Sequence, residues 1–254
     1  MLQLPFLVAL FAKRNEEKKN VFTTDHFIWM GICAVLVGGL LLVSLKCKFS
    51  YKTATRIMAV IAVVSELFKI FTHIEEPESG GGVLGPEFLP LHLCSILIFL
   101  IFFCALSKDV EKVRKVTSFC AAPALWGGLL AILMATSGVS FTKPFAYQCF
   151  LYHAGLVWWA LYLLCTKQAD LGKKAYLRNL GLLSCMLFGM IWVNSALSVY
   201  DTNFWFVVRP PVDGLPLLNL DHGWLCYFFT LVAIGLLAVT VVHLPAMIKE
   251  HKKT

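Results

Sequence analysis

The stretch DHFIWMGICAVLVGGLLLVSLK, residues 25–46, begins with an acidic residue, ends with a lysine and is almost entirely apolar in between. A helix of about 20 apolar residues crosses the hydrocarbon core of a bilayer, so this stretch predicts a membrane-spanning helix. Six further apolar stretches follow along the chain, at 53–74, 89–107, 113–136, 145–166, 175–199 and 223–247. Together they predict an all-α, polytopic membrane protein, folded as a seven-transmembrane-helix bundle.

The composition supports this class. Of the 254 residues, 59% are hydrophobic and 15% are charged, which excludes an ordinary soluble globular domain. Because the connections are short, we expect one bundle over 21–248, an interfacial segment at 1–20 and a basic cytoplasmic tail at 249–254. The nine cysteines are scattered without a CxxC pair, and most are expected to behave as small buried side chains.

Basic residues alternate between the connections. Lysines and arginines crowd the first, third and fifth connections and the tail, whereas the other three connections contain few. Cytoplasmic loops carry the excess of Lys and Arg in membrane proteins, so the pattern predicts an outside N-terminus and a cytoplasmic C-terminus. The net charge of +7 resides in these loops; it indicates topology and lipid contact, and no nucleic-acid partner is expected.

Ionisable and amide side chains interrupt the apolar stretches mainly toward the outer side. With the predicted orientation, Glu66, Lys69, His92, His153 and Asn194 lie in the outer halves of four different helices. A charge at the bilayer centre costs about 2.5–3.5 kcal/mol on insertion scales. Such residues usually face a bundle interior or an aqueous cavity, so we expect an outward-facing polar pocket, with more uniformly apolar cytoplasmic halves.

A purely structural reading of these residues stays open. Glu66 and Lys69 are three residues apart and can form an ion pair that only ties helices together. His73 is nearly aligned with Glu66 on a helix, and the small residues Ala59 and Ala62 continue that face toward a packed neighbour. A single intramembrane histidine is often a hydrogen-bonded packing residue.

Two cysteines are candidate nucleophiles. Cys149 and His153 are four residues apart and share a helix face, which permits a thiol–imidazole pair; a coincidental buried cysteine is the alternative. Cys94 lies two residues after His92, about 200° around a helix, so a regular helix separates the two side chains.

The long outer connection carries an aromatic segment, DTNFWFVVRPP at 201–211. Its aromatic residues suit the membrane interface, and we expect a lid or re-entrant hairpin over the mouth of the bundle. Arg209 can bind a phosphate or carboxylate, and with Asn203, Asn194 and Lys69 it forms the predicted substrate-binding set.

Several of these strings form a recognisable set. They are LPLHLC at 89–94, YHA at 152–154, NFW at 203–205, Arg209-Pro210 and VFTTDH at 21–26. Over most of 20–247 the chain resembles the YwaF family of bacterial integral membrane proteins and, more distantly, the transmembrane protein 164 family. The resemblance implies a multi-pass protein of a bacterial plasma membrane with a seven-helix fold.

For the eukaryotic branch, the resemblance also implies an acyltransferase that moves fatty acyl chains between phospholipids. That activity is associated with an acyl-accepting cysteine immediately before the histidine of the third span. This chain has Leu91 at that position and Cys94 after the histidine. The nucleophile therefore does not carry over, whereas His92 and His153 do.

Two functions follow from the sequence. The first is a membrane-embedded lipid-modifying acyltransferase in which His92 is the base, His153 a second acid/base or oxyanion partner, and Glu66 orients a histidine. Its partners would be membrane lipids, including an acyl-donor phospholipid, with no cofactor. The alternative is a binding, transport or receptor protein that captures a solute or lipid headgroup from outside. A metal site is a weaker hypothesis, because no short-range ligand motif supports one, and we assign no metal.

Overall fold

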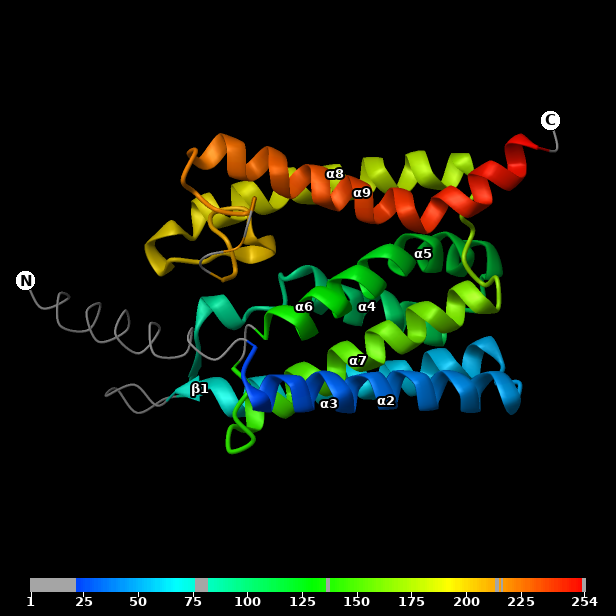
Figure 1. Ribbon diagram of the computed structural model, residues 1–254, viewed down its shortest axis with the longest axis horizontal. Coiled ribbons are helices and arrows are strands. Elements are labelled where there is room, and N and C mark those ends of the chain that lie inside the picture. The colour runs from blue at the N-terminus through cyan, green and yellow to red at the C-terminus, as the bar shows by residue number, and fades with distance from the viewer. Residues whose placement is uncertain (1–21, 76–81, 136–137, 213–214, 216, 253–254) are drawn as a thin grey trace, which may run out of the picture.

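The computed structural model describes residues 22–75, 82–135, 138–212, 215 and 217–252, and it is all-helical apart from one two-residue strand pair (Figure 1). The predicted interfacial segment at 1–20 and the last two residues of the tail lie outside this part of the chain. The long helices are α2 (Thr24–Lys46), α3 (Tyr51–His73), α4 (Leu93–Leu106), α5 (Val110–Ala122), α6 (Gly128–Met134), α7 (Pro144–Cys165), α8 (Lys173–Ala196) and α9 (Trp224–His251). Short elements are the strands β1 (Ile74–Glu75) and β2 (Val83–Leu84) and the turns η2 (Pro86–Phe88), η4 (Ser198–Tyr200) and η5 (Phe204–Phe206).

Five helical units of the described chain are long and apolar enough to cross a membrane. These are α2, α7, α8, α9 and the continuous unit Val110–Met134, in which a π-helical turn, η3 (Pro123–Gly127), joins α5 to α6. The all-helical membrane class is thus confirmed. The stretches predicted at 53–74 and 89–107 also form helices, α3 and α4. They differ from the five because α3 contains the polar residues discussed below and α4 has only 14 residues, about 21 Å of helix.

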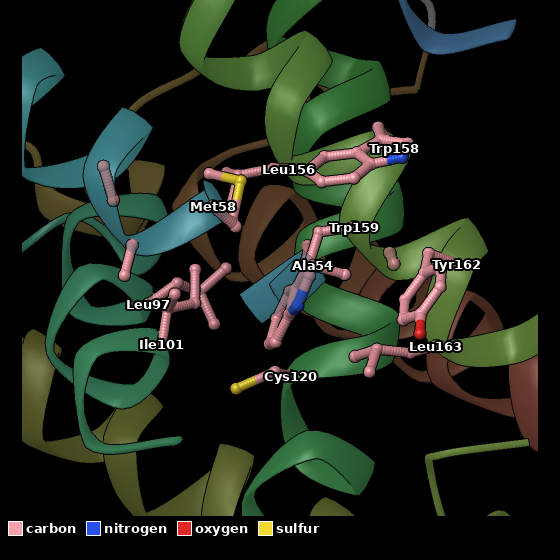
Figure 2. Close-up of a cluster of buried hydrophobic side chains, with 14 of the residues drawn as sticks. Ala54, Met58, Leu97, Ile101, Cys120, Leu156, Trp158, Trp159, Tyr162 and Leu163 are labelled. Atoms are coloured by element: carbon pink, nitrogen blue, oxygen red, sulfur yellow. The ribbon is translucent and has the colours of Figure 1, made fainter. Parts of the chain in front are cut away.

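Helix α7 is the centre of the bundle, and 14 of its 22 residues are buried. It packs against α2, α3, α5 and α6, and Figure 2 shows its Trp158 and Trp159 among side chains of α3, α4 and α5. The indole N–H groups of Trp158 and Trp159 donate to Ser44 and Thr55 at 3.4 and 3.2 Å, as buried indoles require.

Small residues allow α3 to approach α7. Ala59 and Ala62 are buried, as predicted from the shared face. On the α7 side, a Cβ added to Gly155 would lie 3.3 Å from the sulfur of Met58. Close helix contacts of this kind are typical of membrane bundles, where small residues let backbones meet.

Helices α8 and α9 form a pair along one side of the molecule and contact the rest mainly through α5 (Figure 1). A buried polar network joins the three: the amide of Asn179 on α8 donates to Ser118 of α5 at 2.9 Å and lies 3.3 Å from Nε2 of His243 on α9. Nδ1 of His243 lies 3.1 Å from the Leu171 carbonyl. A satisfied polar cluster therefore lies in the half of the bundle where the sequence predicted more uniformly apolar helices.

The connections fall at two ends of the bundle (Figure 1). At one end, Glu250 near the end of α9 accepts from the N–H of Lys173 at 2.9 Å, and Tyr162 donates to the Phe49 carbonyl at 2.8 Å. The basic connections 47–50, 107–109 and 166–172 lie there. The described parts of two other connections, 138–143 and 197–212, lie at the opposite end, so basic and basic-poor connections are separated.

Candidate functional site

Two of the polar residues of α3, Glu66 and Lys69, form an ion pair. Nζ of Lys69 lies 2.6 Å from Oε1 of Glu66, with only 10% and 17% of the two side chains exposed. The pair anticipated from their spacing is therefore formed, in the second half of α3. His73 one turn further is used in packing, because its ring centroid lies 4.0 Å from that of Phe88 and 4.3 Å from that of Phe145.

His92 precedes the first residue of α4 and acts as its N-cap residue without a side-chain capping bond. The sequence placed the start of this helix at residue 89, with Pro90 in its first turn. In the structure Leu89 is extended, as the residue before a proline prefers, and the N–H of Leu91 turns back to the Leu89 carbonyl at 2.7 Å. The helix therefore begins only at Leu93.

The His92 ring rests on two aromatic rings of the outer connection. Its centroid lies 5.2 Å from Phe204, edge to face, and 5.5 Å from Phe206. No residue of the described chain forms a hydrogen bond with either ring nitrogen. Lys69 of α3 and His153 of α7 both act electrostatically on the ring.

His153 is buried on α7, and its tautomer follows from its contacts. Nδ1 lies 2.6 Å from the Cys149 carbonyl oxygen, which can only accept, so Nδ1 carries the proton. Nε2 is then the ring nitrogen left to exchange a proton. The Cys149 sulfur lies 3.6 Å from the same Nδ1. The predicted proximity is real, but a protonated nitrogen cannot take the proton of the thiol.

Cys94 packs against the hydrophobic cluster at the centre of the bundle. Its carbonyl accepts from the hydroxyl of Tyr152 at 2.7 Å. Tyr152 thus joins α7 to the first turn of α4, and Glu66 of α3 acts on it electrostatically.

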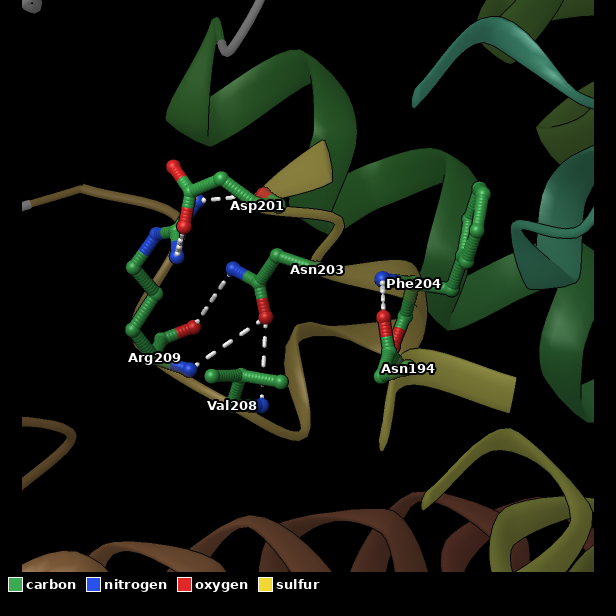
Figure 3. Close-up of polar contacts among 6 residues, drawn as sticks. All are labelled: Asn194, Asp201, Asn203, Phe204, Val208 and Arg209. Atoms are coloured by element: carbon green, nitrogen blue, oxygen red, sulfur yellow. Dashed lines mark hydrogen bonds and ion pairs between the residues drawn. The ribbon is translucent and has the colours of Figure 1, made fainter. Parts of the chain in front are cut away.

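The outer connection is built around two asparagines (Figure 3). Asn194 of α8 accepts from the N–H of Phe204 at 2.8 Å and donates to the Phe204 carbonyl at 3.0 Å. Asn203 accepts from the N–H groups of Val208 and Arg209 and donates to the Arg209 carbonyl at 2.9 Å.

Arg209 is also engaged within the connection. Its guanidinium donates two hydrogen bonds to the Asp201 carboxylate, at 2.6 and 2.9 Å. Such a two-pronged pair is the strongest arrangement these groups form. The predicted set thus divides: Glu66 pairs with Lys69, and Lys69 and His153 act electrostatically on His92. Asn194, Asn203 and Arg209 instead hold the 201–209 segment, whose Phe204 and Phe206 lie against His92.

A comparison with protein-family models gives a match to the TMEM164 family over residues 21–243, which includes every residue of this site. The chain belongs to the TMEM164 family. No curated protein and no solved structure matches it.

In this TMEM164-family chain, the residue before His92 contributes to the site through its main chain. The Leu91 carbonyl accepts from the indole N–H of Trp205 at 2.9 Å. This contact joins the outer connection directly to the start of α4. Among the described residues, no cluster of three or more His, Cys, Asp or Glu side chains could hold a metal ion.

Sequence reasoning missed the residues that hold the cover in place. Trp224 of α9 donates to the Val207 carbonyl at 2.9 Å, and the hydroxyl of Tyr227 donates to the Phe206 carbonyl. Both lie in the HGWLCY string at 222–227, to which sequence reasoning assigned no role. The sequence did offer one signal. A tryptophan and a tyrosine stand one helical turn apart, and both can donate hydrogen bonds to the carbonyls of a non-helical segment.

Proposed function

We propose that this protein is a membrane-embedded acyltransferase that moves a fatty acyl chain between phospholipids, at a site formed by His92, His153, Glu66 and Lys69. The observation that carries the proposal is the state of the two imidazoles. Nδ1 of His153 is used by the Cys149 carbonyl, whereas the described residues form no hydrogen bond with Nε2 of His153 or with either ring nitrogen of His92, and His153 acts electrostatically on the His92 ring. Histidines left available in this way suit proton transfer.

The chemistry follows from the roles that these groups can take. A free hydroxyl of an acceptor lysophospholipid gives its proton to His92 and attacks the ester carbonyl of a donor phospholipid. The new C–O bond forms, the donor ester C–O bond breaks, and the departing alkoxide of the donor takes a proton from the protonated histidine. The overall exchange is balanced and needs no further reagent.

Lys69 and His153 would stabilise the charge that develops. The Lys69 ammonium is fixed by Glu66 at 2.6 Å, so it is held in place before the oxyanion appears, which is the condition for electrostatic catalysis. His153 would accept or release a proton through Nε2 during the exchange. This direct transfer requires no cysteine, which fits Leu91 at the position before His92.

We further propose seven spans, with α3 and α4 crossing alongside the five long units, and a cytoplasmic C-terminus in a bacterial plasma membrane. Helix α3 has 23 residues and packs along α7. The segment before α4 is non-helical, yet Leu91 is hydrogen-bonded by Trp205; irregular backbone at membrane depth is tolerated when it is buried in protein in this way. The clustering of basic connections at one end supports the orientation.

Lipid analysis of a deletion strain tests the function. Loss of the gene is expected to change the acyl composition of membrane phospholipids, and the wild-type gene, but not a His92→Asn gene, is expected to restore it. Unchanged lipids together with a defect in uptake of an external solute would instead favour a capture protein that uses the same outward-facing pocket.

A further inference from the structure

His92 takes its orientation from rings that belong to another part of the chain. Phe204 and Phe206 lie against it with centroids 5.2 and 5.5 Å away. Without a hydrogen bond from the described residues to its nitrogens, the direction in which the imidazole points depends on where these two rings are held.

The rings themselves sit on a backbone that would not adopt its shape unaided. Trp205 and Phe206 both have left-handed φ angles, 59° and 56°, a region that side chains with a Cβ disfavour. The segment is therefore fixed from outside, and the contact that holds the main chain of Phe204 comes from Asn194.

Asn194 engages Phe204 from both sides. Its Oδ1 accepts from the N–H of Phe204 and its Nδ2 donates to the Phe204 carbonyl, at 2.8 and 3.0 Å, while Nδ2 also donates to the Met190 carbonyl of its own helix at 2.8 Å. Asn194 is 3% exposed and Phe204 is fully buried. Both N–H donors of the amide are thus used, and its oxygen is engaged by the Phe204 N–H, which leaves no donor for a substrate.

We propose that Asn194 is a positioning residue for His92. By clamping the main chain of Phe204 it fixes the aromatic wall on which the imidazole rests, and so aims His92 toward Lys69 and His153 and shields it from the outside. The inference rests on the proposed function only in treating His92 as the working base. It replaces the substrate-binding role expected for Asn194 with an indirect one acting through two phenyl rings.

Chemical modification of individual histidines tests this directly. Diethyl pyrocarbonate modifies accessible neutral imidazoles, and mass spectrometry of the full-length protein in lipid nanodiscs gives a rate for each histidine. In Asn194→Ala, the rate at His92 relative to exposed His222 is expected to rise about tenfold. The matched control is Ser195→Ala, because the exposed Ser195 hydroxyl bonds only to the Ile191 carbonyl of its own helix among the described residues; its His92 rate is expected to stay within twofold of wild type.

Two further histidines distinguish a change in the position of His92 alone from a general loosening of the fold. His26 and His243 are fully buried and held by hydrogen bonds away from the 201–209 segment, so their rates are expected to stay low in Asn194→Ala. If this variant does not fold, Asn194→Asp keeps the size of the side chain and the acceptor for the Phe204 N–H but lacks the donor to the Phe204 carbonyl, and a selective rise at His92 is again expected. Unchanged His92 reactivity in a folded variant, or an equal rise at all buried histidines, overturns the proposal.

The readout involves no turnover, so the two ideas can fail separately. A selective rise at His92 with no acyl transfer by the wild-type protein would keep Asn194 as the residue that positions His92 and refute the acyltransferase. Acyl transfer that depends on His92 but is unaffected by substitution of Asn194 would support the acyltransferase and refute the positioning role of Asn194.

Discussion

The main-chain carbonyl of His153 lies 2.9 Å from the position that a Cβ would occupy on Gly128. Gly128 is the first residue of α6, and its missing side chain lets α6 pack directly on the turn of α7 that presents the histidine. A backbone carbonyl cannot swing away as a side chain can, so the site depends on glycine here.

Gly128→Ala is therefore expected to destabilise the protein. The methyl group would also meet Cγ2 of Val157 at 2.7 Å, and overpacking of this kind typically costs about 1–3 kcal/mol. The free energy of unfolding, measured by steric trapping in bicelles, checks this.

The neighbouring Gly127→Ala is the matched control, since a Cβ there meets nothing within 4 Å. It is expected to leave stability unchanged or raise it by up to about 1 kcal/mol, the helix advantage of alanine over glycine. Equal effects of the two substitutions would mean that the close approach to His153 is not what Gly128 provides.

A second close contact, made by a residue of α9, caps the N-terminus of α8. Gly172 precedes α8 without a side-chain cap of its own, and the Glu250 carboxylate accepts from the N–H of Lys173 at 2.9 Å. A Cβ on Gly172 would overlap that carboxylate. Either Gly172→Ala or Glu250→Ala is expected to cost about 1 kcal/mol, the usual effect of losing an N-cap.

Because both changes remove the same cap, the double variant is expected to cost little more than either single one. Gly181→Ala on the same helix meets no neighbour within 4 Å and is the control. Additive losses in the double-mutant cycle would show that Gly172 and Glu250 act independently.

The Glu66–Lys69 pair is expected to behave as a largely buried ion pair. Removing one partner, as in Lys69→Met, leaves the other charge unpaired inside the bundle and is expected to cost about 3 kcal/mol or more in unfolding free energy. The double change Glu66→Leu with Lys69→Met is expected to recover most of that loss.

The exposed pair of Lys115 with Glu111 also has a 2.6 Å separation but side chains 53% and 80% exposed. Glu111→Gln there is expected to cost less than about 1 kcal/mol. A loss for Lys69→Met as small as this one would refute the buried character of the Glu66–Lys69 pair.

Neither candidate cysteine is expected to carry an acyl group. Nδ1 of His153 donates to the Cys149 carbonyl, so it cannot activate the nearby thiol, and Cys94 packs into the central cluster. Acyl-biotin exchange on purified protein should leave both cysteines unlabelled, and a Cys94→Ala, Cys149→Ala protein should retain lipid remodelling. A stable thioester on either residue would establish the covalent route instead.

Periodicity within single helices explains what the sequence could predict. The apolar stretches predicted where the helices lie, with α4 beginning four residues late, and the spacing of Glu66 and Lys69 predicted their ion pair. These relationships arise within single helices.

The roles of the outer residues could not be read from the sequence. An asparagine near a helix end looks the same whether it binds a substrate or clamps a main chain ten residues away, as Asn194 does with Phe204. Likewise, nothing in the spacing of Ser118, Asn179 and His243 indicates that three helices bring them together. Such contacts depend on tertiary packing, which a periodicity argument does not contain.

Acyl transfer by the purified protein is the most direct test of the two-histidine site. The protein would be reconstituted in nanodiscs with an isotope-labelled donor phospholipid and a lysophospholipid acceptor, and the labelled product followed by mass spectrometry. Wild type and the exposed-residue control His222→Asn are expected to transfer the label. His92→Asn and His153→Asn are each expected to lose at least about 100-fold, the usual contribution of a general acid–base group. Transfer at the wild-type rate by the His92→Asn, His153→Asn double variant, or no transfer by wild type, would contradict the proposed two-histidine site.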